Sequence, residues 1–172
     1  MTLSPHGLPP EITVLERGWL SANNILFIGR HDSALVDTGY HSHAEQTVAL
    51  VAACLGGRPL DRVLNTHLHS DHCGGTGALQ AAWPAVRTWV PAPSLPHVQA
   101  WDQDALTFGD SGQRCDRFSA GLALAPGQAV RLGAHAIRAA LERAEVDPAQ
   151  VRCGIAQPSA ADEAVDFGVG EG

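Results

Sequence analysis

The stretch from Thr66 to Gly75 constrains this chain more than any other. It reads Thr-His-Leu-His-Ser-Asp-His-Cys-Gly-Gly, so three histidines and one aspartate fall within six residues. The apolar pair Val63-Leu64 comes shortly before it and predicts a strand that ends in a loop at this point. Neutral imidazole and carboxylate are ligands that zinc and other divalent transition ions prefer. The stretch therefore predicts a metal site at the end of a strand.

The spacing within this stretch suits two adjacent metal positions better than one. His67 and His69 are two residues apart and project together while the backbone stays extended. Asp71 and His72 follow as the loop turns, and Gly74-Gly75 are expected to let the chain turn sharply into a helix. The alternative is a histidine-rich surface loop with no metal, or with an adventitious one.

The pattern His67-x-His69-x-Asp71-His72, followed by two glycines, resembles the HxHxDH signature of the metallo-β-lactamase superfamily. Such a pattern is specific, since four fixed ligand positions in six residues rarely arise by chance in a chain with 9 histidines. The resemblance implies a mixed α/β (α+β) fold, the αββα sandwich, and a metal-dependent hydrolase. It implies that these four residues hold one or two zinc ions, with iron or manganese as other occupants, and that Asp71 is also the catalytic group that orients the attacking water.

A second resemblance lies at Asp37-Thr38-Gly39, because members of the family carry a strand-terminal Asp-x-Gly there. It implies that Asp37 supports the metal loop without being a ligand. On physical grounds Asp37 could accept backbone N–H bonds from the loop or orient a ligand histidine. An ordinary Asx turn before a helix is the alternative.

The rest of the chain predicts strands that alternate with helices, which is typical of a mixed α/β fold. A capping-box pattern at Ser42 and Glu45 predicts a helix that Gly56-Gly57 end. The other predicted elements are an antiparallel meander of strands over 12–15, 24–28 and 33–36, helices over 76–83 and 97–106, and strands over 86–90, 118–124 and 129–132.

The resemblance ends near Ile137. The family implies that the strand beginning near His135 leads to a Pro-Gly-His motif, whose histidine completes the first metal site, but no histidine follows His135. We therefore expect a metallo-β-lactamase-like domain over 1–138, then a segment over 139–172 that forms a helix over 139–146 and a weakly ordered acidic tail. One hypothesis is that the chain is the first half of a hydrolase whose reading frame was shifted or cut near residues 137–141. Translating the coding DNA in the other two frames tests it.

Counting ligands predicts a weakened or inactive site as the alternative to a working one. The chain supplies two ligands for each metal, whereas a catalytic zinc ion usually has three from the protein. His97 or His135 could be recruited, but histidines like these more often belong to the core or surface. Two further alternatives are an iron-dependent oxidoreductase of the same superfamily and a non-catalytic fragment that associates through an exposed sheet edge.

The composition limits the partners. The chain has 172 residues, the size of one domain, and carries 11 Lys plus Arg against 18 Asp plus Glu, a net charge of −7 that argues against nucleic acid. It has no apolar run long enough for a membrane span, and its N-terminus does not resemble a signal peptide. The 4 cysteines form no CxxC pair, which favours free thiols. We therefore expect a cytoplasmic protein. The resemblance implies a small-molecule substrate, which is a thioester, lactone, lactam or phosphoester. An unfinished sandwich would leave apolar sheet surface uncovered, which predicts self-association.

Overall fold

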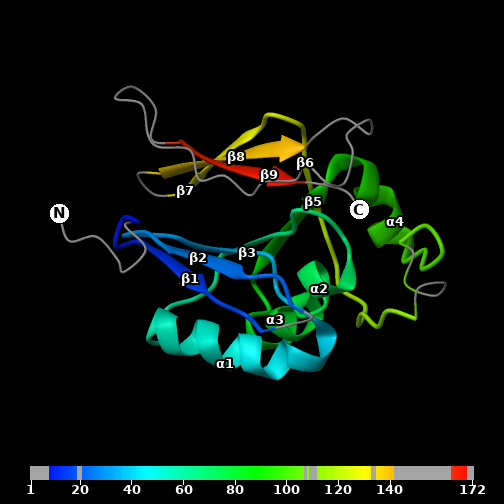
Figure 1. Ribbon diagram of the computed structural model, residues 1–172, viewed down its shortest axis with the longest axis horizontal. Coiled ribbons are helices and arrows are strands. Elements are labelled where there is room, and N and C mark those ends of the chain that lie inside the picture. The colour runs from blue at the N-terminus through cyan, green and yellow to red at the C-terminus, as the bar shows by residue number, and fades with distance from the viewer. Residues whose placement is uncertain are drawn as a thin grey trace.

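The computed structural model describes residues 8–18, 21–106, 108, 112–132, 135–141 and 164–169. Its described residues form a six-stranded sheet, in the order β1-β2-β3-β4-β5-β6, and a three-stranded sheet, in the order β7-β8-β9. Helices α1 (Ala44–Leu55) and α3 (Thr76–Ala82) lie on one face of the larger sheet, and the smaller sheet lies on the other (Figure 1). This is the mixed α/β fold that the sequence predicts.

The larger sheet begins as the predicted meander. Its first three strands, β1 (Ile12–Leu15), β2 (Asn24–Ile28) and β3 (Ser33–Val36), pair antiparallel. The other three, β4 (Arg62–Leu64), β5 (Arg87–Pro91) and β6 (Leu122–Leu124), extend the sheet from β3 in parallel. The carboxyl ends of parallel strands meet at one edge of a sheet, so the segments that follow β3 and β4 lie side by side.

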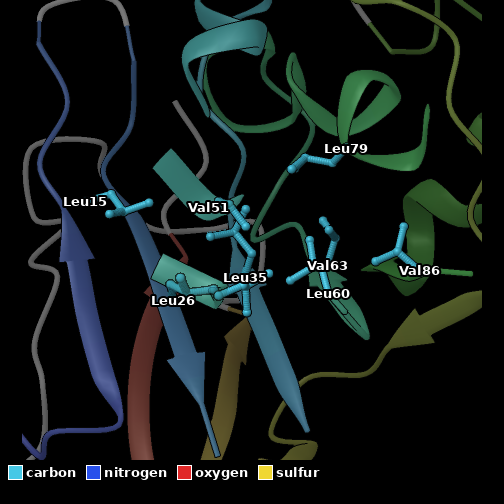
Figure 2. Close-up of a cluster of buried hydrophobic side chains, with 9 residues drawn as sticks. Leu15, Leu26, Leu35, Val51, Leu60, Val63, Leu79 and Val86 are labelled. Carbon is cyan, nitrogen blue, oxygen red and sulfur yellow. The ribbon is translucent and has the colours of Figure 1, made fainter. Parts of the chain in front are cut away.

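The two faces of the larger sheet bury different side chains, as the two-residue period of a strand requires. Leu35 on β3 faces the helices and packs with Val51 of α1 and Leu79 of α3 (Figure 2). Its neighbours Ala34 and Val36 belong to the cluster on the opposite face, which includes Val130 of β7. Alternation along one strand thus joins the helical layer to the second sheet.

The helix boundaries correct the sequence analysis at two places. Helix α1 ends at Gly56, which is left-handed as predicted, but its N-terminus is entered through the 3₁₀ turn His41–His43 without any side-chain cap bond, so no capping box forms between Ser42 and Glu45. Helix α4 (Leu95–Ala100) is shorter than the predicted helix over 97–106, because Trp101 takes a left-handed conformation with φ 54°. Of the strand predicted over 118–124, only Leu122–Leu124 forms.

The smaller sheet also differs from expectation. Strand β7 (Ala129–Leu132) pairs antiparallel with β8 (His135–Leu141), and β9 (Ala164–Val169) pairs parallel with β8. The helix predicted over 139–146 is therefore wrong for its first three residues, which end β8, and residues 142–146 lie outside the described ranges. The part of the predicted tail that the structure describes is a strand. β8 runs through residue 138, and the domain boundary placed there stays a prediction.

None of the helices in the described ranges covers the outer face of the smaller sheet (Figure 1). The described part of the chain thus supplies the helix, sheet and sheet layers of the expected αββα sandwich. Within the same residues, no helix is long and apolar enough to cross a bilayer.

Candidate metal centre

The predicted ligands lie directly after β4, in the segment from Asn65 to Cys73, which we call the metal loop. His67 and His69 lie on its irregular first part. Asp71 and His72 belong to a short helix, α2 (Ser70–Cys73), where the sequence predicted a loop that continues to turn. The strand end and the short helix together position the four side chains.

The metal loop brings these side chains together. The ring centroid of His67 lies 4.7 Å from that of His69 and 3.8 Å from that of His72. The Oδ2 atom of Asp71 lies 3.4 Å from Nε2 of His72. All four residues are half-buried, and the side chain of Asp71 is 42% exposed. Three imidazoles and one carboxylate therefore gather at the carboxyl edge of the larger sheet.

Asp37 joins the end of β3 to the metal loop. Its Oδ1 accepts the backbone N–H of Thr66 at 2.9 Å, and its Oδ2 accepts the hydroxyl of Thr66 at 2.7 Å. The same Oδ2 lies 2.8 Å from Nδ1 of His72, so a proton on Nδ1 directs Nε2 of that ring toward Asp71. Asp37 makes both kinds of contact that its position in the sequence suggests. Its role beside a bound metal stays a prediction.

Three residues that the sequence analysis did not single out hold the backbone of the loop. The carbonyl oxygen of His72 accepts the backbone N–H of Thr38 at 2.6 Å, its hydroxyl at 3.0 Å and the side-chain amide of Asn65 at 3.3 Å. Thr76 at the start of α3 contacts both the Thr38 hydroxyl and the Asn65 side chain. All three side chains are fully buried. The sequence could have indicated these residues, because they are polar and lie within or beside the Asp-x-Gly and HxHxDH patterns.

Gly74 and Gly75 form the predicted turn into a helix, between α2 and α3, but the turn itself does not require glycine. Their φ angles are −61° and −89°, which any residue can adopt. A Cβ atom at Gly74 would instead overlap the backbone nitrogen of His41, and one at Gly75 would overlap the carbonyl oxygen of Thr38. These glycines allow the metal loop to approach the segment after β3 closely.

A second segment of the chain, distant from the metal loop in the sequence, contacts this loop. It comprises residues 112–120, before β6, and we call it the strap. The side-chain oxygen of Gln113 accepts the backbone N–H of Ser70 at 2.9 Å. Oδ2 of Asp116 lies 3.5 Å from Nδ1 of His41. Nothing in the sequence pointed to Gln113, because its partner is 43 residues away.

The environment affects the protonation of two histidines. Burial, together with the nearby His72, lowers the pKa of His67 to about 4. Burial also acts to lower the pKa of His72, but the hydrogen bond and charge of Asp37, with the charge of Asp71, raise it overall. His67 is therefore neutral at pH 7, which is the form that binds a metal ion.

The donor atoms suit zinc, because three imidazoles and one carboxylate form the kind of ligand set that zinc accepts. Their present arrangement is not a formed site, since within the described ranges no three His, Cys, Asp or Glu side chains are placed to hold one ion. His97, a possible recruit, is exposed on α4, and the side chain of His135 lies outside the described residues. The assignment of metal ligands and of the catalytic Asp71 stays a prediction.

Comparison with known proteins supports the reading of the sequence. A family model described as the metallo-beta-lactamase superfamily matches residues 17–151. The chain belongs to this superfamily. The matched range includes the metal loop and Asp37 of this metallo-β-lactamase homologue, together with its strap. No curated protein matches it.

Solved structures of metallo-β-lactamases have the same fold over most of this metallo-β-lactamase homologue. The Cronobacter sakazakii enzyme is 20% identical with a TM-score of 0.59, and the match covers 73% of this chain and 47% of that one. FEZ-1 from Legionella gormanii is 16% identical with a TM-score of 0.59, covering 72% and 46%. BJP-1 of Bradyrhizobium japonicum, a subclass B3 enzyme, is 18% identical with a TM-score of 0.59, covering 73% and 47%. The chain therefore spans about half the length of these structures.

Proposed function

We propose that this chain is the metal-binding part of a zinc-dependent hydrolase that acts on a small-molecule thioester, lactone, lactam or phosphoester, in the cytoplasm. The observation that carries the proposal is the gathering of His67, His69 and His72 beside Asp71, with ring centroids 3.8 and 4.7 Å apart. Membership of the metallo-β-lactamase superfamily supports the same chemistry.

In this proposal His67 and His69 hold one zinc ion, and Asp71 and His72 hold a second. A zinc ion bound here would lower the pKa of a water molecule and polarise the scissile carbonyl or phosphoryl group. Asp71 would orient the attacking water and accept its proton, for which its partly exposed carboxylate is suited. Asp37 keeps His72 in one orientation through the 2.8 Å contact to Nδ1.

A weakened site is the second candidate, and a specific observation favours it. The four predicted ligands provide two per metal, and among the described residues no trio is placed to hold an ion. In this case zinc binds the metal loop but dissociates readily, and hydrolysis is slow or absent.

Metal analysis of the purified chain tests both candidates. We expect zinc to copurify with the chain or to bind it in a calorimetric titration, and to be lost in His67→Ala. His31→Ala is the matched control, because His31 is exposed in the turn between β2 and β3. Zinc that dialyses away from the wild-type chain would favour the weakened site. Equal binding by His67→Ala and the wild type would contradict the proposal, and stoichiometric iron would favour the oxidoreductase.

Hydrolysis of a panel of thioester, lactone, lactam and phosphoester substrates tests the reaction. Asp71→Asn keeps the size of the side chain but removes its basic carboxylate, so the zinc-loaded variant is expected to lose about 100-fold or more in kcat. A chelator should abolish the activity of the wild type. Activity that survives the chelator, or that Asp71→Asn leaves unchanged, would contradict the roles assigned here.

We also propose that the chain self-associates. In the larger sheet β1 and β6 are edge strands, and edge strands present unpaired backbone groups to which another chain can add. Sedimentation velocity at micromolar concentration should then show dimers or larger species. A single monomeric species under these conditions would exclude self-association.

A further inference from the structure

Two cysteines from distant parts of the chain meet where the strap crosses the metal loop. Sγ of Cys73, at the end of α2, lies 3.9 Å from Sγ of Cys115 on the strap. Their separation in the sequence is 42 residues. The approach therefore depends on the fold and has no local cause.

The two thiols differ in their access to solvent. Cys73 is fully buried in the apolar cluster that also contains Leu68 and Phe118, and its Sγ lies 3.4 Å from the carbonyl oxygen of Leu68. Cys115 is only half-buried and lies on irregular backbone, since no helix or strand includes residues 113–120. A small oxidant can reach Cys115 first, with Cys73 placed behind it.

We propose that Cys73 and Cys115 are a redox-active dithiol that closes to a disulfide when the protein meets a peroxide. A disulfide has an S–S length of about 2.05 Å, so the sulfur atoms must approach by roughly 1.9 Å. Residues 113–117 lie on irregular backbone and can supply this movement, while Phe118 and Ser119 anchor the strap behind them. The metal loop does not need to move, because the contacts of Asp37 and Thr38 hold it in place.

The reaction balances with hydrogen peroxide as the oxidant. The Cys115 thiol gives up its proton and its sulfur attacks one peroxide oxygen, the O–O bond breaks, and the leaving hydroxide takes up that proton, so that a sulfenic acid and one water form. The Cys73 sulfur then attacks the sulfenic sulfur, the S–O bond breaks, and a second water leaves. The two thiols are oxidised and the peroxide is reduced. A thiol reductant reverses the change by exchange.

The cross-link would tie the strap to the metal loop beside the Gln113–Ser70 contact. Before Phe118, the polar contact of the strap with the loop is made by Gln113, whose partly exposed side chain can exchange its partner for water. A disulfide would also restrict the unfolded chain by closing a loop of 42 residues. We therefore expect the oxidised chain to melt at a higher temperature than the reduced chain, by about 5 °C or more.

Peptide mapping of the full chain tests the proposal. Reduced protein, kept in chelator so that no metal takes part, is treated with hydrogen peroxide, blocked with N-ethylmaleimide and digested without reductant. Mass spectrometry should then find the peptides of Cys73 and Cys115 joined and lighter by two hydrogens, and dithiothreitol should separate them. Cys54→Ser, which removes an exposed cysteine on α1, and Cys153→Ser should leave this cross-link unchanged.

Two results would overturn the proposal. One is recovery of Cys73 as a free or blocked thiol while Cys115 carries a sulfinic acid. The other is a set of cross-links in which Cys54 or Cys153 pairs as often as Cys73. Cys115→Ser should abolish both the cross-link and the rise in melting temperature, and an unchanged rise in that variant would likewise count against it. Because zinc is excluded throughout, failure here leaves the hydrolase proposal untouched.

Discussion

The metal loop is held on two sides, and the two sides differ in burial. On the sheet side, Thr38 and Asn65 bind its backbone through side chains that are 0% exposed. On the strap side, the polar contact comes from Gln113, which is partly exposed, while Phe118 packs with Leu68 in a buried apolar cluster. Water can reach Gln113 on the strap side but has no access to the polar contacts on the sheet side.

This difference decides which side sets the geometry of the candidate site. A buried polar group left without its partner costs the full desolvation of that group, about 1–3 kcal/mol, whereas exposed contacts contribute about 0–1 kcal/mol. The sheet side therefore fixes where His67, His69 and His72 lie. Residues 113–117, the part of the strap before Phe118, lie on irregular backbone and can shift without moving them. The Cys73–Cys115 reaction needs this freedom.

The largest expected effect comes from adding a side chain at Gly75, where the backbone lies very close to the segment after β3. In Gly75→Ala the new methyl group overlaps the carbonyl oxygen of Thr38, which is backbone and cannot move aside cheaply. We expect a loss of about 3 kcal/mol in the free energy of unfolding, measured with urea. Gly121→Ala is the control, because a Cβ there meets nothing within 4 Å, and it should change stability by about 0.5 kcal/mol or less. Equal stabilities of the two variants would show that the sheet side is not closely packed.

A smaller effect is expected from Asp37→Ala, which removes three hydrogen-bond acceptor contacts from Thr66 and His72. Because the donors of Thr66 and His72 are left without their acceptor, we expect a loss of about 2–3 kcal/mol in the free energy of unfolding. Asp37→Asn should lose less, because asparagine also tolerates the left-handed backbone at this position, where φ is 56°.

The same pair of variants has a readout that packing alone would not change. The hydrogen bond and charge of Asp37 act to raise the pKa of His72, so Asp37→Asn should lower it. Following the His72 ring by NMR from pH 4 to 9 in metal-free protein measures this directly. A His72 pKa that does not fall in Asp37→Asn would contradict the coupling between β3 and the metal loop.

The sheet side is also where the sequence was most informative. Asp37 directly follows the apolar run over 33–36, and the four predicted ligands lie in one segment shortly after Val63-Leu64. Local pattern was therefore enough to locate them. The reason for Gly75 was not visible, because it depends on Thr38, 37 residues away. The glycines predicted the turn that forms between α2 and α3, but not the close approach that requires glycine there.

Long-range pairing explains the other differences. Ala139–Leu141 have helical propensity, but pairing with β9 makes them the end of a strand, and that pairing joins segments more than twenty residues apart. Residues 112–117 of the strap gave no signal for the same reason. Their contacts come from single side chains on irregular backbone, with no periodicity to reveal them.

The smallest expected effect tests the strap side. Gln113→Ala removes the side-chain oxygen that accepts the N–H of Ser70 at the start of α2, a contact similar to a helix cap. Water can replace that oxygen, so we expect a loss of about 1 kcal/mol in the free energy of unfolding. Gln99→Ala, at an exposed position on α4, is the matched control and should change stability by about 0.5 kcal/mol or less. If Gln113→Ala proved as damaging as Asp37→Ala, the two sides would hold the loop equally, and a strap free to close the disulfide would be ruled out.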